Sequence, residues 1–204
     1  MTGNAPIDGR LVLASNNAGK LAELDALLQP LGFALVSQAQ LAIAGAPETA
    51  DTFLENALAK ARHAARASGL PALADDSGLC VDALGGAPGV RSARYAGADA
   101  NDRANNEKLL ATLAGQDNRP AHYHCTVVLL RHAADPAPLV AQGNWHGRIL
   151  TAARGDNGFG YDPLFWVASE SASSAQLPAQ RKNSVSHRAQ ALQALATMLR
   201  SQGI

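Results

Sequence analysis

Short apolar runs alternate with helical patterns along the first part of the chain, and this alternation limits the choice of fold. The runs 11–14, 33–36 and 70–74 have the length and composition of buried strands. Leucines at helical spacing follow the first run. A long Ala-rich helix is predicted from a capping box at Thr52 to about Ser68. Alternation of this kind favours an α/β protein.

The later part of the chain predicts a hairpin, so the sheet is expected to be mixed. The segments 122–130 and 139–149 are predicted to pair antiparallel. We expect 169–180 to be a surface excursion and a last helix to begin near Ser184 or Ser186.

The length of the chain and its lack of a long linker limit how many domains it can form. The 204 residues can form one large domain or two small lobes that share a core. The sequence has neither an internal repeat nor a long linker. We therefore predict a single domain over residues 1–204, in which residues 1–9 form a loose leader.

Charge and cysteine content exclude several classes of protein. Seventeen basic and seventeen acidic residues cancel, so the broad basic surface of a duplex-binding protein is not expected. No apolar run has the length of a membrane span. Cys80 and Cys125 are too few for a disulfide framework or a Cys-based zinc site, and they fit a reducing compartment. We expect a cytoplasmic protein without a nucleic-acid or membrane partner.

Two adjacent carboxylates, Asp75 and Asp76, follow the run 70–74, and we expect them at the end of that strand. Like charges side by side repel, so stability does not require them, whereas a metal ion or a proton-transfer site does. Glu48 or Glu55 lies upstream as a third acid. Carboxylate oxygens without a Cys or His cluster favour Mg²⁺, which binds together with substrate phosphates.

Basic groups lie at two expected helix starts. The first is the turn from Ser15 to Lys20, where free N–H groups and the helix dipole attract phosphate. The alternative is a capped helix with a surface lysine. The second contains Lys182, His187 and Arg188, whose charges oppose the dipole unless an anion is bound. The alternative there is a solvated basic surface.

Glycines bracket an aromatic residue in the loop 155–163. Such a loop lets the backbone approach a flat ligand, and the Phe159 ring can stack on a base. Asp162 either reads an N–H group of that base or holds the loop through a turn hydrogen bond. Together with the acids and the anion sites, the loop indicates a nucleoside triphosphate site, but not which bond breaks.

Six motifs are specific in combination: Ser-Asn-Asn-Ala-Gly-Lys, Thr-Phe-Leu-Glu-Asn-Ala-Leu-Ala-Lys-Ala, Ala-Asp-Asp-Ser-Gly-Leu, Gly-Gly-Ala-Pro-Gly-Val-Arg-Ser-Ala-Arg-Tyr, Gly-Phe-Gly-Tyr-Asp-Pro and Ser-His-Arg-Ala. In these motifs the sequence resembles the non-standard purine nucleoside triphosphate pyrophosphatases, also called inosine triphosphatases or the Ham1-like family. The resemblance runs from about Leu11 to the C-terminal helix.

The resemblance implies a two-lobed α/β fold with a long central mixed β-sheet flanked by helices, and a homodimer. It implies Mg²⁺-dependent hydrolysis of ITP, dITP and XTP to the monophosphate and pyrophosphate, which cleanses the nucleotide pool. A water molecule oriented or deprotonated by Asp76 would attack the α-phosphorus.

The resemblance also assigns roles residue by residue. Asp76 would accept the proton, and Glu48, Asp75 and Asp76 would lie at the metal. Pro47 stands where many members carry a second acid. The substrate would be bound by a larger set, matched motif by motif: Ser15, Asn16, Asn17, Ala18, Gly19, Lys20, Lys60, Ser77, Phe159, Gly160, Tyr161, Asp162, Lys182, His187 and Arg188.

Two alternatives stay open. A Maf-like nucleotide pyrophosphatase has a related fold and acts on modified pyrimidine or other nucleotides. A nucleotide-binding regulator would bind without turnover, and it would not require a proton acceptor such as Asp76.

Overall fold

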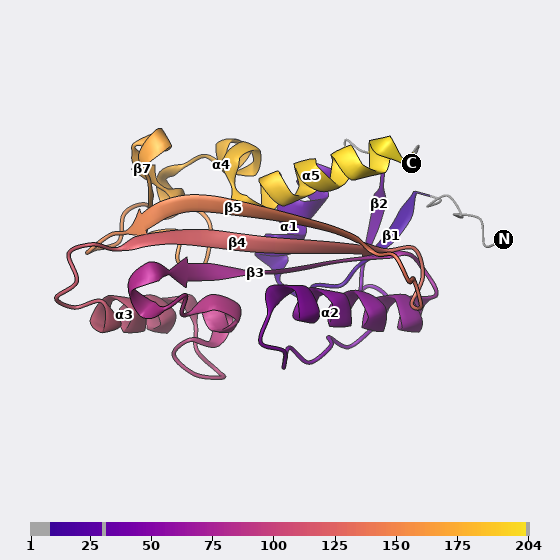
Figure 1. Cartoon of the computed structure of the whole chain (residues 1–204), viewed down its shortest axis with the longest axis horizontal. Helices are drawn as coiled ribbons and strands as arrows, with labels where there is room; N and C mark the ends of the chain where they lie inside the picture. Colours follow the sequence, from indigo (N-terminus) through magenta and orange to yellow (C-terminus); the bar gives the residue numbers. More distant parts are fainter. Residues whose placement is uncertain (1–8, 30–31, 203–204) are drawn as a thin grey trace. The chain divides into compact units, whose positions relative to one another are not determined.

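The computed structural model describes residues 9–29 and 32–202, so the predicted leader lies outside them except for Gly9 (Figure 1). One seven-stranded sheet has the order β2-β1-β3-β4-β5-β6-β7. The strands are β1 Arg10–Leu13, β2 Ala34–Ser37, β3 Ala72–Val81, β4 Pro120–Leu130, β5 Leu139–Ile149, β6 Phe165–Val167 and β7 Ala172–Ser173. The α-helices are α1 Ala18–Leu28, α2 Phe53–Ser68, α3 Asp102–Thr112, α4 Ala179–Val185 and α5 His187–Ser201.

Parallel and antiparallel pairs make the sheet mixed. β1 pairs in parallel with β2 and β3, whereas β6 is antiparallel to both β5 and β7. β4 and β5 are neighbours joined by residues 131–138, which is the predicted hairpin. The predicted α/β class with a mixed sheet and flanking helices is confirmed. Within the described residues, no helix combines the length and the apolar composition needed to cross a bilayer.

The chain divides into two compact units. The first unit comprises residues 1–76, 125–143 and 188–204, and the second comprises 77–124 and 144–187. Strands β3, β4 and β5 contribute residues to both units, because their bounds cross the division. The single domain over the whole chain stays a prediction.

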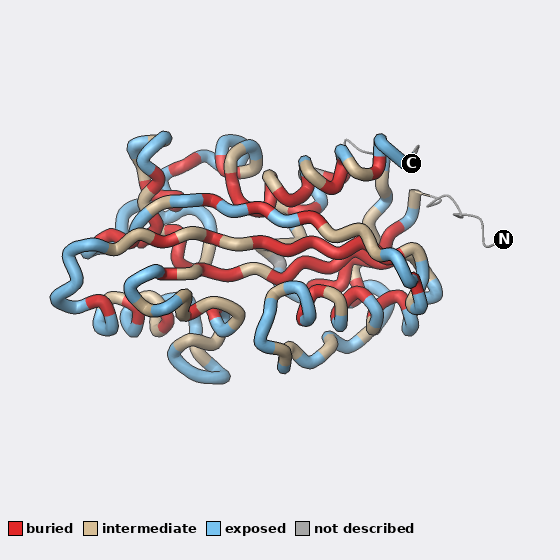
Figure 2. Tube along the Cα trace, in the orientation of Figure 1, coloured by how far each residue is buried: buried red, intermediate tan, exposed pale blue. Residues whose placement is uncertain are grey.

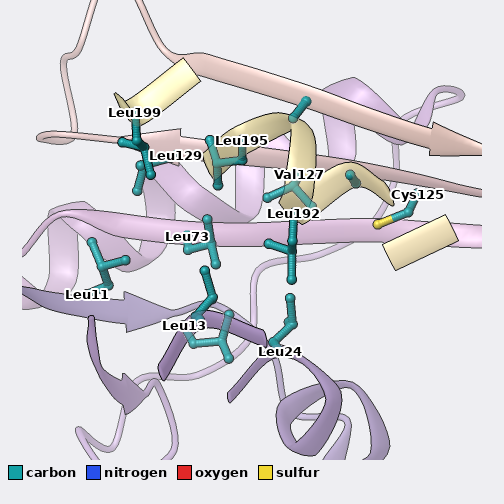
Figure 3. Packing of buried hydrophobic residues seen from close by; sticks show 13 residues of the cluster. Leu11, Leu13, Leu24, Leu73, Cys125, Val127, Leu129, Leu192, Leu195 and Leu199 are labelled. Carbon is teal, nitrogen blue, oxygen red and sulfur yellow. The ribbon is translucent and has the colours of Figure 1, made fainter. Parts of the chain in front are cut away.

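Helices cover both faces of the sheet in the first unit. Leu11, Leu13 and Leu73 pack with leucines of α1 and α5 on one face (Figure 3). Val12 and Ala72 pack with alanines of α2 on the opposite face. Side chains alternate along a strand, so neighbouring residues serve different cores. Figure 2 shows the long buried stretches of β3 and β4.

Helix α2 has the bounds that its sequence predicts. The Thr52 hydroxyl accepts the Glu55 N–H at 3.2 Å and so caps the first turn. Gly69 ends the helix in the left-handed region, with φ of 70°. Between these ends, Ala57 and Ala61 are fully buried, because their small side chains let the helix lie close to the sheet.

A separate core fills the second unit. Leu109 of α3 and Leu113, which directly follows that helix, pack in one cluster with Leu79, Trp145 and Phe165 from the strands. Asn101 caps the start of α3, since its side chain accepts the Ala104 N–H at 2.9 Å.

The predicted surface excursion at 169–180 is wrong for its middle part, although residues 178–180 are exposed. Residues Ser173 and Ser174 are fully buried, and Ser173 belongs to β7. Their hydroxyls donate to the Arg154 carbonyl at 2.5 Å and to Asp162 Oδ1 at 2.8 Å. Small polar side chains therefore enter the core because each finds an acceptor there.

The prediction that the two acids lie at the end of a strand is also wrong. Asp75 and Asp76 lie inside β3, which continues to Val81. The last helix begins at His187, directly after Ser186, which confirms the second of its two predicted starts. The short helix α4 precedes it, and Lys182 lies in the last turn of α4 instead of at a helix start.

The turn between β4 and β5 depends on the buried carboxylate of Asp135. Its Oδ2 accepts the Arg131 N–H at 3.0 Å, and its Oδ1 accepts Arg131 Nη2 at 2.6 Å and the Ala137 N–H at 3.0 Å. The Arg131 hydrogen bonds outweigh burial and hold the pKa of Asp135 well below its usual range.

We predict that Asp135→Asn lowers the free energy of unfolding by about 1–3 kcal/mol at pH 7, measured by urea titration. The pKa of Asp135 is lower in the folded state than in the unfolded state. The stabilisation is therefore present above the unfolded pKa of about 3.9 and is lost as the pH falls through the folded value. The exposed Asp117→Asn is the control, with an expected change within about 0.5 kcal/mol. Equal unfolding midpoints for Asp135→Asn and the wild type would contradict the prediction.

Candidate active site

The two adjacent acids lie where one parallel strand ends and its neighbour continues. β1 ends at Leu13, which is paired with Leu73 of β3. β3 runs on to Val81, so Asp75 and Asp76 lie past the carboxyl end of β1. Ligands of open α/β sheets bind at such carboxyl ends, which makes this place the candidate active site.

The two acids face opposite sides of the sheet, because successive side chains of a strand alternate. Asp75 Oδ2 lies 3.1 Å from Lys20 Nζ of α1 and 3.4 Å from Arg188 Nη2 of α5. Arg188 is 1% exposed and also forms an ion pair with Glu23. Asp75 is thus a buried counterion for two cations from different helices.

Asp76 contacts α2 on the other face. Its Oδ1 lies 2.9 Å from Lys60 Nζ, and its Oδ2 accepts Asn56 Nδ2 at 3.3 Å. Lys60 Nζ also lies 2.7 Å from Glu48 Oε1. One ammonium therefore joins the carboxylates of Glu48 and Asp76.

The two environments move the pKa values of the two acids in opposite directions. Burial alone would raise the pKa of Asp75, but Lys20 and Arg188 hold it well below its usual range. Burial raises the pKa of Asp76, and Lys60 offsets this only in part. Burial would lower the pKa of Lys60, yet the surrounding carboxylates raise it. Asp75 is consequently a fixed anion, whereas Asp76 is the more basic carboxylate and the better proton acceptor.

The turn from Ser15 to Lys20 leads β1 into α1. Asn17 caps the helix, since its Oδ1 accepts the Lys20 N–H at 3.0 Å. Asn16 Oδ1 accepts Gln38 Nε2 at 2.8 Å. These contacts fix the turn, and Lys20 extends from it to Asp75.

Asp162 organises the Gly-rich loop of the second unit. The residue is 2% exposed, and its Oδ2 accepts the Phe159 N–H at 3.0 Å and lies 2.6 Å from Lys182 Nζ. Gly158 has φ of 78°, and a side chain there would collide with the Asp162 carboxylate. Of the two roles considered for Asp162, the structure shows the one that holds the loop.

Helix α3 holds both backbone groups of Gly160. The Gly160 N–H donates to Asp102 Oδ2 at 2.6 Å, and Asn106 Nδ2 donates to the Gly160 carbonyl at 2.8 Å. Tyr161 is buried and donates its hydroxyl to the Ser92 carbonyl at 2.8 Å. The loop is therefore anchored at successive residues.

Two aromatic contacts complete this region of the second unit. Lys182 Nζ lies 4.7 Å from the centroid of the half-buried Phe159 ring. The His187 ring stacks on Tyr123 with centroids 4.7 Å apart and an interplanar angle of 9°. A flat aromatic ring with a cation beside it is suited to a base that carries phosphates.

The predicted site residues thus form one cluster in each unit. The first unit brings together Lys20, Glu48, Lys60, Asp75, Asp76 and Arg188. The second unit groups Phe159, Asp162 and Lys182, while Ser77 follows Asp76 in β3 and is half-buried. Sequence reasoning missed Glu23 and Asn56. Two sequence signals pointed to Asn56: it lies one helical turn before Lys60, and it is the Asn of the motif Thr-Phe-Leu-Glu-Asn-Ala-Leu-Ala-Lys-Ala.

The donor set of the first unit fits Mg²⁺. Carboxylate oxygens of Glu48 and Asp76 converge on one cationic centre, the Lys60 ammonium. Among residues 9–29 and 32–202, no three His, Cys, Asp or Glu side chains are grouped as ligands of one metal. Mg²⁺ commonly takes one or two carboxylates and completes its shell with water and substrate phosphates, so two converging carboxylates suffice.

The sheet and the acid–lysine cluster define an α/β protein with a charged site at the carboxyl end of a parallel strand. The chain belongs to the Ham1 family, whose model matches residues 11–198. Membership of this family sets aside the Maf-like alternative.

Relatives and solved structures match nearly the whole chain. A dITP/XTP pyrophosphatase from Ralstonia nicotianae is 57% identical over 194 residues, which is 94% of this chain and 96% of the relative. A dITP/XTP pyrophosphatase from Shigella flexneri is 54% identical and covers 94% of this chain and 98% of its own. The structure of a HAM1 protein from Coxiella burnetii has a TM-score of 0.87 at 48% identity, over 94% of this chain and 98% of that one.

We predict different effects on stability for substitutions of the two acids. Asp75→Asn leaves the buried Arg188 and Lys20 without their shared counterion and should lower the free energy of unfolding by about 3 kcal/mol. Asp76→Asn should be neutral or stabilising at pH 7. Its raised folded-state pKa means that folding favours the uncharged form, so its charge costs stability at that pH. Urea unfolding of both variants at pH 7 tests this, and an equal loss in both would contradict it.

Proposed function

We propose that this chain hydrolyses non-standard purine nucleoside triphosphates, namely ITP, dITP and XTP, to the nucleoside monophosphate and pyrophosphate. The observation that carries the proposal is the basic carboxylate of Asp76, held between Lys60 and Asn56 past the end of β1. The choice of substrate is supported by close relatives that are named dITP/XTP pyrophosphatase.

Asp76 accepts the proton of the attacking water molecule. The water oxygen forms a bond to the α-phosphorus, and the bond from that phosphorus to the bridging oxygen breaks, so pyrophosphate leaves. Without a metal, burial raises the pKa of Asp76, and Lys60 and Asn56 hold its carboxylate in place to take the proton. A pure binding protein would gain nothing from such a group.

Cations of the first unit neutralise the phosphates. Lys20 and Lys60 are each paired with a carboxylate in the free protein and can exchange that partner for a phosphate oxygen. Glu48 and Asp76 would hold Mg²⁺, which supplies charge neutralisation at the phosphate oxygens when bound. Asp75 keeps Arg188 in place, and its contact with the metal stays a prediction.

The loop of the second unit binds the base. Phe159 provides the stacking surface, and Lys182 and His187 lie beside the aromatic contacts of that region. The carboxylate of Asp162 is engaged within the loop, so backbone groups of the loop are the candidates for reading the purine edge. A site rejects the wrong base strongly when that base leaves buried polar groups of the protein without hydrogen-bond partners. Binding of ATP, which carries an amino group at position 6, would be disfavoured in this way.

The proposal includes the assembly and the location of the protein. We propose a homodimer, as the family resemblance implies. A cytoplasmic location follows from a nucleotide-pool substrate and agrees with the free thiols of Cys80 and Cys125.

We predict release of pyrophosphate from ITP, dITP and XTP in the presence of Mg²⁺, with at least about tenfold lower kcat/KM for ATP and GTP. EDTA should abolish the activity and added Mg²⁺ should restore it. Ion chromatography of the first product separates pyrophosphate from orthophosphate. Orthophosphate as the first product, or equal rates with ITP and GTP, would contradict the proposal.

We predict that Asp76→Asn lowers kcat by about 10²–10⁴-fold, because the proton acceptor is lost, while substrate affinity stays within a few-fold of wild type. Single-turnover kinetics and equilibrium titration with a non-hydrolysable ITP analogue measure the two quantities separately. The exposed Asp117→Asn is the matched control and should retain full activity. An active Asp76→Asn protein would remove Asp76 from the catalytic role.

A further inference from the structure

Asn56 makes three hydrogen bonds from the buried face of α2, one turn before Lys60. Its Oδ1 accepts the Ala50 N–H at 3.0 Å, and its Nδ2 donates to the Ala50 carbonyl at 3.2 Å. Nδ2 also donates to Asp76 Oδ2 at 3.3 Å. The side chain is 1% exposed, so one buried amide uses its acceptor and both of its donor hydrogens.

The two oxygens of Asp76 are held by neighbouring turns of the same helix. Lys60 Nζ lies 2.9 Å from Oδ1, and Asn56 Nδ2 lies 3.3 Å from Oδ2. Residues four apart share one face of a helix, which brings both donors to one carboxylate. The χ2 torsion of an aspartate has a broad distribution, so the carboxylate plane can rotate. One hydrogen-bond donor on each oxygen fixes that plane, whereas a single donor would still allow rotation.

The other end of the Asn56 amide anchors the segment that carries Glu48. Residues 43–50 belong to no helix or strand, so no regular backbone pairing fixes them. The two bonds from Asn56 to Ala50 replace that pairing two residues after Glu48. Glu48 Oε1 then lies 2.7 Å from Lys60 Nζ.

We infer that Asn56 is a positioning residue for hydrolysis, because it ties the segment 48–50 to α2 and sets the plane of the Asp76 carboxylate at the same time. Asn56 acts through Asp76 and Glu48. The effect on turnover rests on the proposed function, whereas the anchoring of Ala50 rests on the hydrogen bonds alone.

Two variants separate the two contacts. Asn56→Leu has nearly the same size and removes all three hydrogen bonds. Asn56→Asp keeps an acceptor for the Ala50 N–H but removes both donors. The matched control is Asn105→Leu in α3, because Asn105 is also buried and accepts the Ala96 N–H at 2.8 Å and donates to the Ala93 carbonyl at 3.1 Å. Both of those bonds go to backbone groups.

Hydrogen exchange of the Ala50 amide, measured by NMR without substrate or metal, reports directly on its hydrogen bond to Asn56. We expect protection to fall at least about tenfold in Asn56→Leu and to persist in Asn56→Asp. We expect kcat to fall about 10- to 100-fold in both Asn56 variants with KM within about threefold of wild type, as a misplaced catalytic group predicts. Asn105→Leu should lower Tm to a similar extent and keep kcat near wild type.

The inference is overturned if the Ala50 amide stays protected in Asn56→Leu. It is also overturned if kcat of both Asn56 variants matches that of Asn105→Leu at a temperature where all are folded. If Asn56→Leu does not fold, Asn56→Asp carries the kinetic comparison. A wild-type protein that releases no pyrophosphate overturns the proposed function instead, and the exchange measurement still decides whether Asn56 anchors Ala50.

Discussion

Two adjacent carboxylates inside one strand determine where the first unit must place its buried cations. Asp75 and Asp76 are buried in β3 and face opposite sides of the sheet, so they form their ion pairs with different cations. A buried charge is tolerated only when it is paired. Lys20 and Arg188 therefore serve one face, and Lys60 serves the other. Helices α1, α5 and α2 must all present a cation at the same level of the strand.

Separate faces also give the two acids separate chemistry. Nearby cations, first of all Lys20 and Arg188, lower the pKa of Asp75 and keep it ionised, whereas burial raises the pKa of Asp76. When the surroundings give two titratable groups very different pKa values, one can act as a counterion and the other as a proton acceptor. Neighbours in sequence thus become unlike groups in the site, and the alternation of a β-strand is sufficient to separate them.

The second unit uses a buried carboxylate in another way. Asp162 joins the Phe159 N–H, Ser174 and Lys182, while α3 holds both backbone groups of Gly160. Glycines give this loop its left-handed turns, and the carboxylate removes the freedom that glycines would otherwise bring. A loop fixed in this way presents its backbone groups in a set order, which selective recognition of a base requires.

Local chemistry in the sequence determined much of the fold and the residue types of the site. Apolar runs, the cap at Thr52 and the glycine at position 69 predict β-strands and helix α2, because short-range hydrogen bonds and periodicity decide them. The family motifs include Lys20, Lys60 and Asp76. Only the tertiary structure decided which face each acid occupies, that Asn56 bridges Ala50 and Asp76, and that Ser173 is buried. These features depend on contacts between residues far apart in the chain, which no local pattern specifies.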